Sequence, residues 1–266
     1  LARFTWMLMA GRRRSLRRTG RILFGPRASP EALDRFGRRV LENIQSFIAD
    51  VASIDRCTVA EVGARAVHFE NLDRFMSVVS ERRGAILVSA HLGSFESAVA
   101  AMRRVCDTPV HVLFARDHIT AFDRVRSRAR RHLGIVEHPV GDGVQSWLEL
   151  HDALKRGELV TILADRTMPG QRGTATRFFG QSAELPLGPL RLAAASGAPL
   201  LPTFALPTLD GQWTLRFEPL IEVEPDGRTL DGEHPAQRRM VEAMERAIQE
   251  APEHWLVVAG PWSTPA

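Results

Sequence analysis

Short apolar runs, each entering a turn and then an amphipathic segment, are the main pattern of this chain. The first clear run, Ala85–Ala90, holds only apolar or small residues without a period of two, and a predicted helix over Ser97–Val105 follows it. Similar runs cover Val110–Phe114, Leu159–Ala164 and Ala198–Ala205. Such runs are typical of buried parallel strands. The alternation predicts an α/β fold with a mostly parallel central sheet flanked by helices.

Apolar residues at helical spacing predict the remaining elements. Positions Phe36, Val40, Ile44, Phe47 and Val51 follow Pro30, a residue typical of a helix start, so the N-terminal portion is predicted to be helical. We predict further helices over Thr58–Ala66, Leu72–Ser80, Ala121–His132, Val144–Lys155, Gly188–Gly197 and Pro235–Ala251. We also predict a short strand over Ile135–His138, a peripheral antiparallel strand over Gln212–Val223 and a closing strand over His254–Ala259. The last of these is equally compatible with a turn. No composition shift marks a boundary, so residues 30–266 are predicted to form a single domain.

Charge separates residues 1–29 from the rest of the chain. The first 40 residues carry 11 arginines against Glu31 and Asp34, whereas the whole chain has a net charge of +4. Phe4 and Trp6 lie beside this arginine cluster, in an apolar run shorter than the roughly 20 residues that cross a bilayer. We predict a basic amphipathic membrane-interface segment. The alternative is an ordinary helix packed on the domain with its arginines in water.

Several chemistries lack their motifs in this sequence. Cys57 and Cys106 make neither a disulfide framework nor a metal-ligand cluster, so no metal is predicted. The chain has no G-x-S-x-G nucleophile motif, no Walker phosphate loop and no complete G-x-G-x-x-G. Its arginine clusters lack interleaved aromatic residues, so a nucleic-acid partner is not predicted.

Four histidines stand five residues before a carboxylate, although composition alone predicts about one such pair. His68, His118 and His132 lie in charged stretches typical of solvated surface pairs. Only His91 follows a buried strand and shares its turn with a glycine, Gly93. Parallel sheets place their chemistry at the carboxyl ends of strands, which is where His91 is predicted to lie.

The pair of His91 and Glu96 suits acid–base chemistry. With His91 on the turn and Glu96 in the first helical turn, the carboxylate could orient the imidazole while His91 removes a proton from a hydroxyl that attacks a thioester. Gly93 would let the backbone approach the thioester oxygen, with N–H groups at the helix start as an oxyanion site. The alternative is a histidine hydrogen-bonded in a packed turn.

A second informative stretch runs from Leu159 to Phe204. Asp165 and Arg166 end a predicted buried strand and are candidates for a substrate site, or else for a surface salt bridge. A loop rich in glycine and polar residues then leads to Phe178, Phe179 and Gly180. We predict that this aromatic stretch helps to shape a substrate channel, although such residues more often belong to a core.

Several stretches together resemble the bacterial lipid A biosynthesis acyltransferases, a family that includes mycobacterial phosphatidylinositol mannoside acyltransferases. The similar pieces are GAILVSAHLGSFE, the helix from Asp123 to Arg130, the strand ending in Asp165, RFFGQSAELPLGPLRLAAASGAPLLP, and PEHW at 252–255. They cover most of residues 80–260 in the same order. Ser94-Phe95, Thr167 and Leu256–Ala259 depart from the family pattern, which leaves the dyad intact and the acceptor lipid open.

The resemblance implies transfer of an acyl chain from an acyl carrier protein or acyl-CoA to a hydroxyl of a glycolipid acceptor, with no cofactor. His91 matches the catalytic histidine and Glu96 the acid of its motif. Arg130 and Asp165 match charged positions near the site, and Asp165 is a second candidate partner for His91. The family also implies an anionic membrane surface as partner, at the cytoplasmic face of the bacterial inner membrane, by peripheral binding or an anchor upstream of the chain. The competing function is a catalytically silent lipid-binding or scaffold protein with the same fold.

Overall fold

A computed structural model describes residues 10–117, 119–167, 171, 173–210, 212–223 and 230–262. Its helices are α2 (Ala10–Phe24), α3 (Pro30–Ser53), α4 (Val59–Gly63), α5 (Leu72–Ser80), α6 (Phe95–Met102), α7 (Thr120–His132), α8 (Val144–Lys155), α9 (Gly188–Ser196) and α10 (Pro235–Glu250), with short 3₁₀ turns η1 (Ile54–Arg56), η2 (Val140–Asp142) and η3 (Pro252–His254). Its strands are β1 (Ala66–Glu70), β2 (Ala85–Ser89), β3 (Val110–Phe114), β4 (Ile135–Pro139), β5 (Leu159–Leu163), β6 (Gly173–Phe178), β7 (Gln181–Pro186), β8 (Leu200–Pro207) and β9 (Trp213–Phe217).

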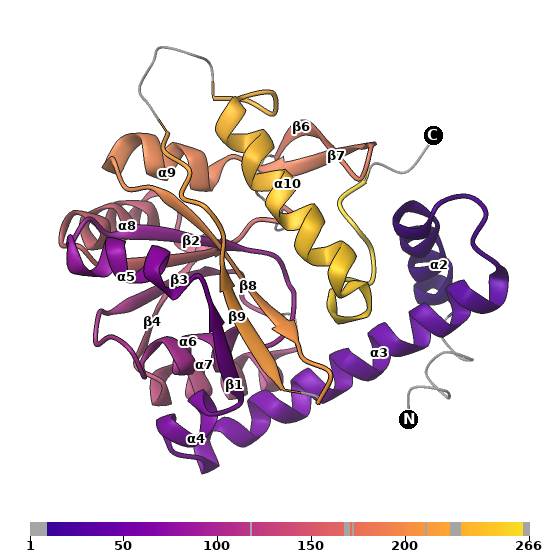
Figure 1. The fold of residues 1–266 in the computed structure, drawn as a ribbon, viewed down its shortest axis with the longest axis horizontal. Helices are drawn as coiled ribbons and strands as arrows, with labels where there is room; N and C mark the ends of the chain where they lie inside the picture. The colour runs from indigo at the N-terminus through magenta and orange to yellow at the C-terminus, as the bar shows by residue number, and fades with distance from the viewer. Residues whose placement is uncertain are drawn as a thin grey trace.

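A mostly parallel sheet forms the centre of the molecule (Figure 1). Within the described residues it has seven strands in the order β1-β9-β8-β2-β5-β3-β4. All neighbouring pairs are parallel except β8 and β9, which are antiparallel. The predicted α/β fold with a mostly parallel sheet and an N-terminal helical portion is therefore confirmed.

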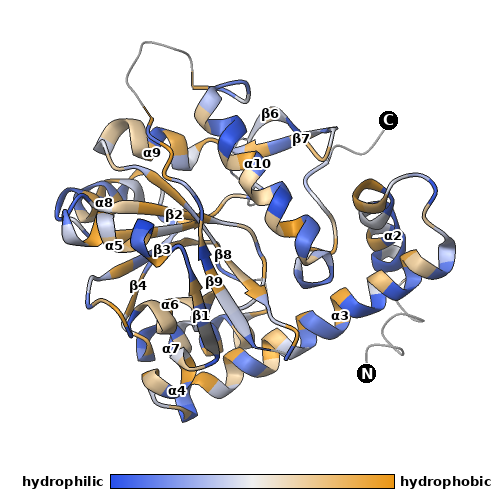
Figure 2. Ribbon diagram, viewed as in Figure 1, coloured by the Kyte–Doolittle hydropathy of each residue, from blue (hydrophilic) through white to orange (hydrophobic). Residues whose placement is uncertain are grey.

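Two apolar clusters fill the space between this sheet and the helices. One joins strand residues to α8, α9 and α10, and the other joins strand residues to α4, α5, α6 and α7. Hydrophobic and hydrophilic segments alternate along α3 and α10 in Figure 2, as expected of helices with one face on a core. The central strands are buried on both faces, which explains why they appear in the sequence as continuous apolar runs.

Two parts of the sheet structure were not predicted. β1 lies where the chain was predicted to be helical, and β6 pairs with β7 as an antiparallel hairpin where a loop was predicted. β1 is an edge strand whose His68 and Glu70 are exposed, so its sequence lacks the continuous apolar run that predicts a buried strand. The hairpin turns at Phe179 and Gly180, both with positive φ, and this dipeptide is not one of the common hairpin signals.

Helix α2 packs beside α3 at one end of the molecule (Figure 1). Leu16 is buried against Phe36 and Val40, and Arg17 pairs with Asp34 through a distance of 2.8 Å between Nη2 and Oδ2. The apolar residues 4–8 of the predicted membrane-interface segment lie outside the described residues, so that role stays a prediction. None of the described helices combines the length and the apolar run needed to cross a bilayer.

Candidate active site

The turn after β2 carries His91 and is held in place by its backbone. Leu92 N–H donates to Ala90 and Gly93 N–H donates to the carbonyl of His254, at 2.7 and 3.2 Å. Gly93 has a φ of +69°, and a Cβ there would lie 2.7 Å from the Ala205 carbonyl oxygen. The glycine is required because the backbone bends against a neighbouring strand. The N–H groups of Leu92 and Gly93 are both occupied, and the predicted approach of a thioester oxygen to the Gly93 backbone and the helix start stays a prediction.

His91 forms its carboxylate contact across the sheet, with Asp165. β2 and β5 are parallel with Ser89 opposite Leu163, and His91 and Asp165 each stand two residues beyond that pair. His91 Nδ1 lies 2.7 Å from Asp165 Oδ1. The indole of Trp255 donates to the other carboxylate oxygen at 2.7 Å. Strand register therefore aligns the two residues, and Trp255 fixes the carboxylate plane.

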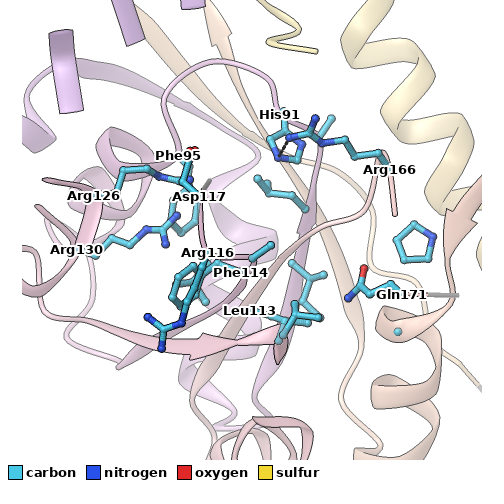
Figure 3. Close-up of a pocket in the computed structure, with 18 of the residues that line it drawn as sticks. His91, Phe95, Leu113, Phe114, Arg116, Asp117, Arg126, Arg130, Arg166 and Gln171 are labelled. Atoms are coloured by element: carbon cyan, nitrogen blue, oxygen red, sulfur yellow. Dashed lines mark hydrogen bonds between the residues drawn. The ribbon is translucent and has the colours of Figure 1, made fainter. Parts of the chain in front are cut away.

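Asp165 is held in its charged form. It is completely buried, which by itself raises the pKa of a carboxyl, but the charge and hydrogen bond of His91 and the Trp255 indole lower the pKa to about 2. An ionised Asp165 accepts from Nδ1–H, so that whenever His91 is neutral its lone pair lies on Nε2. Arg166 donates to that Nε2 at 3.3 Å (Figure 3).

Glu96 faces α7 instead of His91. The predicted dyad of His91 and Glu96 is therefore wrong, because the carboxylate bonded to the imidazole is that of Asp165. Glu96 Oε1 instead accepts a hydrogen bond from Arg130 Nε at 3.2 Å and lies 3.9 Å from Arg126 Nε. Glu96 is fully buried, and its Oε2 has no hydrogen-bond partner among the described residues. Spacing along the chain could not reveal this, because Glu96 lies in the first turn of α6, and packing sets the direction of that helix.

Arg130 is the anchor of this second cluster. Its guanidinium also donates to Glu137 at 3.1 Å and lies over the rings of Phe95 and Phe114 at 5.8 and 5.0 Å. Arg130 is 2% exposed, so its charge is held at a defined position. The prediction that Arg130 lies at the site is consistent with this placement, and its binding role stays a prediction.

A cavity of about 1700 Å³ opens beside His91. The predicted residues His91, Gly93, Glu96, Arg130 and Arg166 line it, whereas Asp165 lies behind His91. Its wall is mainly apolar and includes side chains from α3, α7, α8 and α9: Ile44, Phe47, Ile48, Phe122, Val125, Val144, Trp147, Leu148 and Leu192. The volume exceeds the roughly 300–1,000 Å³ of ordinary small-molecule pockets, which suits a long apolar ligand.

Arginines dominate the charge of this cavity. Arg116, Arg126, Arg130, Arg166 and Arg191 line it, against the carboxylates of Glu96 and Asp117. Burial lowers the pKa of the Arg126 guanidinium, and so does the nearby charge of Arg130. The Nε atoms of Arg126 and Arg166 are buried without a hydrogen-bond partner in the described chain. Figure 3 shows Arg126 and Arg130 on one side of the cavity and Arg166 at His91. This arrangement can bind an anionic group.

Phe178, Phe179 and Gly180 do not line the cavity, which corrects the prediction of a channel-forming role. Phe178 is fully buried, and its ring lies 6.0 Å from the rings of Trp255 and Trp262. Phe179 and Gly180 form the hairpin turn. The aromatic cluster supports Trp255, and through it Asp165. Sequence reasoning missed the contact made by Trp255, although its PEHW motif was a signal, because the partner lies 90 residues away.

The chain matches one known protein family along almost its whole length. Residues 1–264 match the family described as bacterial lipid A biosynthesis acyltransferase. The chain belongs to this family. It is 28% identical over 133 residues to a phosphatidylinositol mannoside acyltransferase of Mycobacterium tuberculosis, covering 50% of this chain and 42% of that protein. It is 26% identical over 153 residues to one of Mycolicibacterium smegmatis, covering 57% and 49%. The matched part thus spans less than half the length of these relatives, and the resemblance seen in the motifs is confirmed.

Proposed function

We propose that this protein is a membrane-associated O-acyltransferase that moves a fatty acyl chain from a thioester to a hydroxyl of a glycolipid. The observation that carries the proposal is the pair of His91 and Asp165 beside a large, mostly apolar cavity, with His91 Nε2 bonded only to the Arg166 side chain among the described residues. Family membership supports the same reaction class. The names of the mycobacterial relatives support a mannosylated phosphatidylinositol as the kind of acceptor.

The chemistry is a direct acyl transfer. The acceptor hydroxyl replaces Arg166 at Nε2, and His91 removes its proton as the oxygen attacks the thioester carbonyl carbon. The carbon–sulfur bond then breaks, and the leaving thiolate takes the proton from the imidazolium. Asp165 stays ionised throughout and stabilises the imidazolium. The described residues that line the cavity include no Ser or Cys, which favours direct attack over an acyl-enzyme.

The arginines and the apolar wall of the cavity have different proposed roles. The Arg166 guanidinium lies beside the reacting centre, where it can stabilise the oxygen that gains charge. Arg126 and Arg130 suit the phosphates of either donor, acyl carrier protein or acyl-CoA. The apolar wall holds acyl chains. Peripheral binding at the cytoplasmic face of the membrane is the setting we propose, because both thioester donors occur in the cytoplasm.

Lipid mass spectrometry tests this function. Cells with wild type, a His91→Ala variant or a deletion are compared, with His132→Ala as a surface-histidine control. We expect one glycolipid to lose a single acyl chain in the deletion and in His91→Ala, and not in His132→Ala. A lipid change in the deletion alone would reject His91 as the base. Unchanged lipids in the deletion would favour a silent lipid-binding protein.

A further inference from the structure

Exposed aliphatic side chains gather at the mouth of the cavity. Among the described residues, seven large apolar side chains are exposed, and four of them line the cavity. These four, called here the apolar rim, are Ile48, Ile119, Val144 and Leu148, with exposed fractions of 42, 66, 72 and 55%. Single exposed apolar residues are ordinary on a protein surface, whereas a cluster around a cavity marks a contact site.

The rim is assembled from separate elements at the carboxyl edge of the sheet. Ile48 belongs to α3, Ile119 precedes α7, and Val144 and Leu148 lie in the first two turns of α8. α7 and α8 begin after the carboxyl ends of β3 and β4, so their first turns meet at the same edge as His91. The rim therefore lies where the cavity that contains His91 meets solvent.

Arginine side chains line the same cavity as the apolar rim. Arg116 and Arg191 are exposed and line the same cavity, and Arg126 lies further inside. The carboxylate nearest in sequence, Asp117, is engaged by the backbone N–H of Ile119 at 2.8 Å. Exposed aliphatic residues combined with arginines match the surface of a bilayer that contains anionic lipids.

We propose that the apolar rim and its arginines dock the protein on an anionic lipid bilayer, with the cavity open toward the lipid. This inference rests on the proposed function, because it gives a membrane acceptor a path to His91 without its chains entering water. An acidic carrier protein fits less well, since protein interfaces of that kind have polar rims. The basic helix α2 buries Leu16 against α3, and Phe24 is its one exposed large apolar side chain among the described residues, so α2 offers no comparable apolar cluster.

Vesicle flotation tests this docking surface. The purified protein is mixed with vesicles of phosphatidylcholine, with or without phosphatidylglycerol at one third of the lipid. The rim variant combines Ile119→Ser, Val144→Ser and Leu148→Ser. The matched control combines Val136→Ser and Leu209→Ser, which are exposed apolar residues away from the cavity. We expect about a ten-fold or greater loss of binding for the rim variant, no change for the control, and weaker binding without phosphatidylglycerol.

Three further measurements distinguish the alternatives. Thermal unfolding of both variants excludes a folding defect, because all the replaced side chains are exposed. Reversal of α2 charges by Arg12→Glu and Arg14→Glu should matter less than the rim. The proposal is overturned if these reversals abolish binding while the rim variant floats normally, or if the rim variant loses only affinity for an acyl carrier protein. His91→Ala should still float, so a failure of the acyl-transfer chemistry and a failure of the docking surface give different results.

Discussion

Two histidine clusters associated with the same sheet differ in what their nitrogen atoms contact. His91 Nδ1 is hydrogen-bonded to Asp165. Its Nε2 is hydrogen-bonded to Arg166, and both residues line the cavity. His111 on β3 and His138 on β4 instead share a contact of 2.9 Å between Nδ1 and Nε2. Their other nitrogens contact Glu158 and Glu149 at 2.9 and 3.0 Å.

The difference separates the histidine that we propose as the base from a histidine pair with no access to the cavity. His111 and His138 are buried and have carboxylate partners, as His91 has Asp165. All four of their ring nitrogens form hydrogen bonds within the protein, however, and neither residue lines the cavity. Burial lowers the pKa of His111, and the hydrogen bond and charge of Glu158 partly oppose this shift. A carboxylate partner alone therefore does not mark a site. A ring nitrogen that also faces a cavity is the feature that indicates a candidate catalytic histidine.

The largest effect is expected for Asp165→Asn. The amide cannot stabilise an imidazolium or enforce the same tautomer, so we expect transfer to fall by about 10²–10⁴-fold. Initial rates with a thioester donor measure this. Near-normal rates would show that His91 works without Asp165.

Glu96→Gln should lower stability more than catalysis. It removes the charge that compensates Arg130 and Arg126, and breaking a buried ion pair costs about 3 kcal/mol. Chemical denaturation measures the free energy of unfolding. If Glu96→Gln reduces turnover as strongly as Asp165→Asn does, the assignment of the two carboxylates is wrong.

The pKa of Asp165 also makes a pH-dependent prediction. Its folded pKa of about 2 lies below the unfolded value near 4, so its ionisation stabilises the fold fully above about pH 4 and loses this effect as the pH falls toward 2. The contribution is about 2–3 kcal/mol. Wild type and Asp165→Asn should therefore converge in stability at low pH in denaturation series. A constant gap between pH 5 and 2 would contradict the ionised, buried carboxylate.

His111→Gln should have the smallest effect on turnover, namely none. The change leaves His138 and Glu158 with an unmet hydrogen bond, so the free energy of unfolding should fall by about 1–3 kcal/mol. Turnover is measured at a temperature where the variant is fully folded. A reduced rate in the folded variant would mean that this histidine cluster acts on the reaction.

The sequence predicted what depends on local pattern. Strands such as Ala85–Ser89 were found because both faces are buried and turns follow them. The edge strand β1 and the β6–β7 hairpin were missed because their residues are partly exposed and lack a common turn signal. Their existence depends on pairing partners that the local pattern does not specify.

The site was predicted in its members more than in its contacts. His91, Asp165 and Arg166 were identified as residues at strand ends, and the structure brings them together. Glu96 was chosen as the partner of His91 because it is near in sequence. The actual contact depends on the parallel register of β2 and β5, and register does not appear in residue spacing.

Paired replacement of the two kinds of histidine tests the central claim most directly. Turnover and unfolding are measured for wild type, His91→Gln and His111→Gln with one thioester donor and the glycolipid pool of the producing cell. Both variants lose stability, because each loses a hydrogen-bond partner of a buried carboxylate or histidine, so rates are compared at a temperature where both are folded. We expect folded His91→Gln to lose about 10²–10⁴-fold in rate and folded His111→Gln to keep its rate. A folded His91→Gln variant that transfers acyl chains at the wild-type rate would contradict this expectation.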